Sequence, residues 1–178
     1  MIHLPPVPTW DALHPLIVHF PIVLLLVAPL FIVLGALMPK SGRAMYLAAL
    51  ILMVLGTVSA FVSFETGEAA GKLAERTPQI NAAIEHHEEL AETTRLLFSI
   101  LTAIFAGLLY VPRFMRFEIG RRAQAIAAFV FLFFYASGTL VLVNTAHQGG
   151  MLVHQYGVHA LVAPDANNPP PAAPEPGD

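Results

Sequence analysis

Residues 16–38 of the chain read LIVHFPIVLLLVAPLFIVLGALM and contain no aspartate, glutamate, lysine or arginine. A helix needs roughly 20 apolar residues to cross a hydrocarbon core of about 30 Å. This stretch therefore predicts a membrane span, and similar apolar stretches follow at residues 44–64, 96–111 and 123–143. Short connections after the first and third stretches favour antiparallel neighbours. The expected fold is all-α: an integral membrane four-helix bundle.

The composition also indicates a chain solvated largely by lipid. Of 178 residues, 56% are hydrophobic and 12% are charged, whereas about 25% of the residues are charged in a typical soluble domain. The net charge of -3 gives no reason to expect nucleic-acid binding. The chain has no cysteine, which excludes disulfides, thiolate metal sites, iron–sulfur clusters and covalently attached haem, but not haem held by histidine alone.

Residues 1–163 are expected to form one membrane domain, followed by a disordered tail at residues 164–178 that is rich in proline and alanine. A polar helix over residues 79–95 is expected to extend the third span outside the membrane. Pro29 lies in the middle of the first span, where its lack of an N–H removes the backbone hydrogen bond to Leu25.

Small residues recur every four positions along the second span and beyond it. Their spacing is typical of a seam for close helix packing, and we interpret them as architecture. They are Ser59, Ser63, Gly67 and Gly71.

Basic residues distinguish the two sides of the membrane. The connections after spans one and three, which lie on the same side of a four-span bundle, carry Lys40, Arg43, Arg113, Arg116, Arg121 and Arg122. The positive-inside rule places these connections in the cytoplasm. In a bacterial inner membrane, both termini and residues 65–92 are then expected on the periplasmic side.

Histidine pairs stand near the outer ends of three spans: His14 and His19, His86 and His87, and His147 and His154. A bundle brings positions of equal depth together, and bundle cores commonly hold metals and cofactors. His86 and His87 are adjacent and diverge by about 100° on a helix, so only one is expected to face the core. His147 and His154 are seven residues apart and point the same way.

Gly149 and Gly150 lie between the last two histidines. Two adjacent glycines are unfavourable inside a helix. They indicate either the end of the fourth helix or a flat surface that an object such as a porphyrin approaches closely.

Haem b held by two histidines from different helices is the leading interpretation, because neutral imidazole is a good axial ligand for iron. Arg95 is a candidate partner for the haem propionates. Copper or zinc is the competing cofactor, since imidazole suits both metals, and the candidate metal ligands are His14, His19, His87 and His147. The remaining alternative is a non-catalytic membrane subunit whose histidines bind nothing.

Several motifs carry a family resemblance. Residues 14–21 read HPLIVHFP, residues 66–70 read TGEAA, residues 85–88 read EHHE, and residues 146–158 read AHQGGMLVHQYGV. Together they resemble the DUF2231 family of bacterial multi-pass membrane proteins, over nearly all of the chain except the tail.

This resemblance places His14, His19, His147 and the His86/His87 pair at the family's histidine positions, whereas His154 stands where many relatives have another residue type. Related domains are joined to cytochrome c modules in some bacteria. The resemblance thus implies a role in electron transfer in a respiratory or related redox chain. Candidate partners are a periplasmic c-type cytochrome or another redox subunit, and the chain is a candidate member of an oligomer or a larger complex, whose composition the sequence leaves open. An enzyme with its own substrate is not expected, because few polar groups line the spans.

Overall fold

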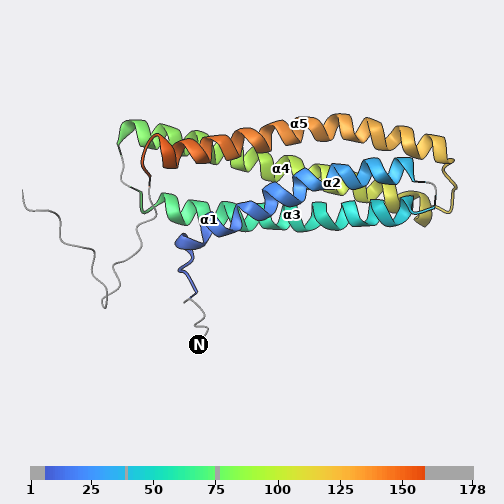
Figure 1. Ribbon diagram of the computed structural model, residues 1–178, viewed down its shortest axis with the longest axis horizontal. Helices are drawn as coiled ribbons and strands as arrows, with labels where there is room; N and C mark the ends of the chain where they lie inside the picture. The colour runs from blue at the N-terminus through green and yellow to red at the C-terminus, as the bar shows by residue number, and fades with distance from the viewer. Residues whose placement is uncertain (1–6, 39, 75–76, 159–178) are drawn as a thin grey trace, which may run out of the picture.

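The computed structural model describes residues 7–38, 40–74 and 77–158. Its long helices, which run side by side in Figure 1, are α2 (His19–Leu37), α3 (Gly42–Gly71), α4 (Pro78–Phe114) and α5 (Arg121–His154). A 3-10 turn, η1 (Asp11–Leu13), and the one-turn helix α1 (His14–Ile17) precede α2. All of the regular structure in these residues is helical, which confirms the all-α prediction. The expected tail at residues 164–178 lies outside the described residues.

The described residues contain the four spans that the sequence predicts, judged by helix length and apolarity. Four helices in this part of the chain are long and apolar enough to cross a membrane, one of them formed by η1, α1 and α2 together. The helices form a closed ring, in which α2 packs on α3, α3 on α4, α4 on α5, and α5 on α2. The outer surface is apolar, with Leu30, Phe133 and Leu140 each more than 60% exposed. Exposed apolar surface on this scale implies contact with the lipid bilayer.

Two ends of the bundle are distinct. Helix α1, the start of α4 and the ends of α3 and α5 gather at one end (Figure 1), which we call the histidine end after His14 and His87. The starts of α3 and α5 and the end of α4 gather at the other, which we call the arginine end after Arg43, Arg113 and Arg116. Both described ends of the chain therefore lie at the histidine end.

Helix α4 is longer than a bilayer requires. At 1.5 Å per residue its 37 residues span about 55 Å, against about 30 Å of hydrocarbon. Its start is well defined, because the side chain of Thr77 accepts a hydrogen bond from the Ile80 N–H at 3.2 Å and Pro78 occupies the first turn. The expectation that residues 79–95 extend the third span as a helix is confirmed.

Aromatic rings from three helices fill the centre of the bundle. Ring centroids lie 5.3 Å apart for Phe98 and Tyr135, 5.8 Å for Tyr135 and Phe131, 5.0 Å for Phe131 and Phe105, and 6.2 Å for Phe105 and Tyr46. All five rings are buried. The chain of contacts joins α3, α4 and α5, so it fixes their relative rotation in the core.

Tyr135 also supplies a hydrogen bond that α2 cannot make for itself. Its hydroxyl donates a hydrogen bond to the carbonyl oxygen of Leu25 at 2.7 Å. Pro29, four residues after Leu25, has no N–H, so α2 itself cannot satisfy that carbonyl. Because hydrocarbon offers no alternative donor, α5 supplies the missing one and ties the two helices together.

Replacing Tyr135 with phenylalanine is expected to lower the free energy of unfolding by about 1–3 kcal/mol, because the Leu25 carbonyl is left buried without a donor. In a Pro29→Ala background the alanine N–H restores the helical bond, and the same Tyr135→Phe change should have a much smaller effect. Denaturant unfolding of the four proteins in detergent measures this double-mutant cycle. Equal losses in both backgrounds would show that the hydroxyl does not replace the proline's missing N–H.

Candidate functional site

A cavity of about 460 Å³ opens at the histidine end, which is within the usual range for ligand pockets. Residues from α1, α2, α3, α4 and α5 line it, and His14 and His87 are among them. Both histidines are partly buried. They come from different helices and are close enough to interact electrostatically.

His14 is held in one orientation by α3. Its Nδ1 lies 2.9 Å from the carbonyl oxygen of Ser63 and 3.3 Å from the hydroxyl of Thr66. A carbonyl can only accept, so Nδ1–H is the donor, and in the neutral ring Nε2 carries the free lone pair. Donation from one ring nitrogen to a backbone carbonyl is the usual way to orient a metal-binding histidine.

His87 presents an unpartnered nitrogen. Its Nδ1 is buried and makes no hydrogen bond of normal geometry among the described residues, although the backbone of Thr145 lies near enough to the ring to interact with it. Close by, the hydroxyls of Thr94 and Thr145 form a hydrogen bond at 2.8 Å that links α4 to α5. A buried polar atom without a partner is uncommon in folded proteins.

Each of these imidazoles lies against a glycine of another helix. A Cβ atom at Gly67 would stand 2.7 Å from Cε1 of His14, and one at Gly149 would stand 3.0 Å from Cε1 of His87. A Cβ at Gly67 would force the His14 ring to move, whereas one at Gly149 would require the His87 ring to shift by only a few tenths of an ångström. Gly150 also lines the cavity, and a Cβ there would meet nothing within 4 Å.

Helix α5 continues through both glycines to His154, so the alternative that they end the fourth helix is wrong. The close approach at Gly149 is that of the His87 ring. The open surface beside Gly150 belongs to the cavity.

The other candidate histidines lie differently. His19 lines the cavity but is exposed. His86, His147 and His154 are exposed and are not part of the lining. The His86/His87 pair divides as expected for adjacent helical residues, since only His87 faces the cavity.

Arg95, the candidate partner for a propionate, is not part of the lining, although Phe64, one of its contacts, is. Its guanidinium lies 4.2 Å from the ring centroid of Phe64 and 5.1 Å from that of Phe61. It also donates a hydrogen bond to Glu92 at 3.5 Å. These contacts hold the side chain against α3.

The cavity does not assemble a larger set of metal ligands. Among residues 7–38, 40–74 and 77–158, no three histidine, cysteine, aspartate or glutamate side chains come close enough to hold a metal ion together. The lining at the histidine end is mostly apolar, and its ionisable side chains are His14, His19, His87, Glu68 and Glu88.

The family model described as "Predicted membrane protein (DUF2231)" matches residues 10–161. The chain belongs to this family. Every residue that lines the cavity lies within the matched region, so the cavity is part of the DUF2231 domain. No curated protein and no solved structure matches the chain.

The sequence did not identify the residues that contact the His14 ring and hold it in place. Ser63 and Gly67 belong to the small-residue seam that we interpreted as helix packing, and Thr66 was not singled out. The structure shows that these three residues contact an imidazole instead. The signal that could have found them is the TGEAA motif, since Thr66 and Gly67 begin one of the DUF2231 motifs.

Proposed function

We propose that this DUF2231 protein binds haem b in the cavity at the histidine end and transfers electrons there. One observation carries the proposal: His14 and His87, from different helices, line the same cavity. The donor chemistry fits the group, because the bond from His14 Nδ1–H to the Ser63 carbonyl leaves Nε2 free, and neutral imidazole is a standard axial ligand of haem iron.

The protein's own residues would set the properties of the site. When bound, haem supplies a one-electron redox couple. His14 and His87 would hold its iron, Ser63 and Thr66 would orient His14, and the Thr94–Thr145 pair would fix α4 against α5. The apolar lining, which includes Ile84 and Leu142, would restrict water and thereby influence the reduction potential.

Copper or zinc is the competing cofactor for the same cavity. Structural zinc is almost always bound by four protein ligands and catalytic zinc by three, whereas the described residues bring together a pair of imidazoles. Haem iron can be held by two imidazoles, so a pair of histidines favours haem over zinc.

The proposed location follows from charge and topology. The positive-inside rule assigns the arginine end to the cytoplasm, which would put the histidine end and the proposed haem on the periplasmic side of a bacterial inner membrane. A c-type cytochrome or another redox subunit could then exchange electrons at that surface.

The test is a dithionite-reduced minus oxidised visible spectrum of the full-length protein, purified in detergent from haem-replete bacterial cells. We expect the sharp α band of a b-type cytochrome and a stoichiometric haem content by the pyridine haemochrome assay. A spectrum without an α band would contradict the proposal. Metal analysis of the same sample would then separate a copper or zinc module from a subunit without a cofactor.

A further inference from the structure

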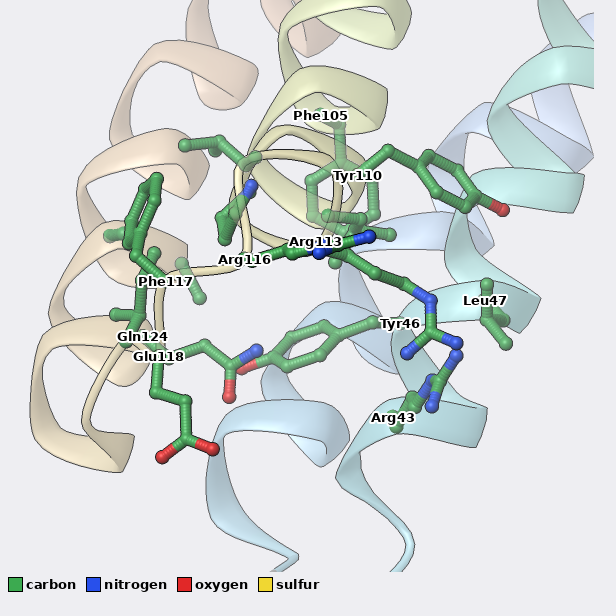
Figure 2. A pocket seen from close by; sticks show the side chains of 16 residues that line it. Arg43, Tyr46, Leu47, Phe105, Tyr110, Arg113, Arg116, Phe117, Glu118 and Gln124 are labelled. Atoms are coloured by element: carbon green, nitrogen blue, oxygen red, sulfur yellow. The ribbon is translucent and has the colours of Figure 1, made fainter.

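A second cavity, of about 550 Å³, lies at the arginine end. Figure 2 shows it between the start of α3, the end of α4 and the segment that leads into α5. Three arginines contribute to its lining: Arg43, Arg113 and Arg116. We propose that this cavity binds the phosphate group of an anionic phospholipid.

The three arginines lack acidic partners. Among the described residues no carboxylate lies within 4.0 Å of any of them, and the ion pairs of the structure are elsewhere. In Figure 2 the side chains of Arg43 and Arg113 extend toward each other, while the carboxylate of Glu118 points away from them. A phosphate between two guanidinium groups would offset their repulsion and accept bidentate hydrogen bonds from them.

Arg116 occupies a position that usually requires glycine. Its φ is 56°, in the left-handed region. The Arg116 N–H donates to the Arg113 carbonyl at 3.4 Å, and the Phe117 N–H donates to the Pro112 carbonyl at 3.1 Å. This bond pattern is the Schellman motif, in which the left-handed residue is most often glycine because a side chain is disfavoured there.

The positive-inside rule accounts for arginines in this connection, but not for an arginine at its one left-handed position. A ligand that contacts the side chain accounts for it. Strained positions of this kind often accompany functional sites, and this one lies on the wall of the cavity.

Two helices, α3 and α5, begin at this end, and their first turns carry no carboxylate and no side-chain cap. Arg43, which lines the cavity, lies in the first turn of α3 instead. A cation there opposes the helix dipole, so an anion bound beside Arg43 would relieve an unfavourable arrangement.

The apolar part of the lining favours a lipid over free phosphate. Leu108, Phe117 and Ile119 line the cavity and are each at least 40% exposed. Exposed apolar side chains next to arginines suit a headgroup phosphate whose acyl chains continue into the bilayer. Basic cavities between helices on the cytoplasmic side of membranes bind anionic headgroups in this way.

The test uses the full-length protein, delipidated in a nonionic detergent. Dioctanoyl phosphatidylglycerol, dioctanoyl phosphatidylcholine and inorganic phosphate are added separately, and binding is followed by native mass spectrometry and by the Tm. We expect phosphatidylglycerol alone to remain bound and to raise the Tm. Arg43→Gln and Arg113→Gln should each weaken its binding about tenfold, the effect of losing one charge-assisted contact.

Arg122→Gln is the matched control, because it removes the same charge at the same end but lies outside the lining. It should leave the affinity nearly unchanged. Arg116→Gly should raise the Tm of the lipid-free protein and still weaken phosphatidylglycerol binding, a combination that structural damage cannot produce.

Three outcomes would overturn the proposal. Equal binding of phosphatidylcholine, whose phosphate is balanced by a cationic choline, would show that the net negative charge of the lipid is not recognised. Equal stabilisation by inorganic phosphate would show that the ligand is not a lipid. If Arg122→Gln weakened phosphatidylglycerol binding as much as Arg113→Gln, the binding would reflect a general attraction of anions to a basic surface.

Discussion

Replacing either His14 or His87 with alanine is expected to abolish the α band and to lower haem affinity by more than about 100-fold, beyond the loss caused by removing an outer-shell partner of a ligand. These two imidazoles line the cavity from different helices, so each removal would leave the iron with at most one axial ligand. Titration of haem into the apoprotein, followed by visible absorption, measures the effect. A full α band in both variants would contradict the assignment.

Histidines outside the cavity are the matched controls. His86→Ala changes the residue next to His87, and His147→Ala and His154→Ala change exposed histidines on α5. All three variants should keep the spectrum of the unchanged protein. His147 is the most informative of them, because the sequence places it among the ligands and the structure places it outside the lining.

Rescue by free imidazole separates ligation from folding. In His14→Gly or His87→Gly, added imidazole can occupy the space left by the ring and restore the α band if that ring is a ligand. If His14 only supported the fold through its bond to Ser63, imidazole would restore no α band, and that result would remove it from the ligand set.

Replacing Gly67 with alanine is expected to weaken haem binding by about 10- to 100-fold, the range seen when a ligand loses its orienting partner. The new Cβ would stand 2.7 Å from Cε1 of His14, so the ring must move from the position in which Nδ1 lies 2.9 Å from the Ser63 carbonyl. The measurement is the same haem titration.

Other glycines provide the controls for this change. At Gly71, also on α3, the nearest atom to an added Cβ is the Glu88 Oε1 at 3.5 Å, an ordinary contact. Gly71→Ala should therefore bind haem normally. On α5, Gly149→Ala should weaken binding less than Gly67→Ala does, and Gly150→Ala should not weaken it. Equal losses at all four positions would show that helix propensity, and not the position of the imidazoles, controls binding.

The spans could be predicted from the sequence because a membrane helix satisfies its own backbone hydrogen bonds. Its existence depends on local length and apolarity, both visible at residues 16–38. The absent hydrogen bond to the Leu25 carbonyl could be predicted for a similar reason, because the lack of an N–H is a property of Pro29 itself. The TGEAA and AHQGG motifs identified the family for a similar reason, because they are contiguous in the chain.

Only the tertiary structure decided which histidines share a cavity. His87 and His147 were both expected near the outer surface, but each residue along a helix rotates its side chain by about 100°, and packing sets which direction faces inward. The spacing of small residues likewise could not show whether they allow two helices to pack closely or leave room for an imidazole ring. At Gly67 that distinction depends on α1 lying against α3, a contact between residues about 50 positions apart in the chain, which no local pattern encodes.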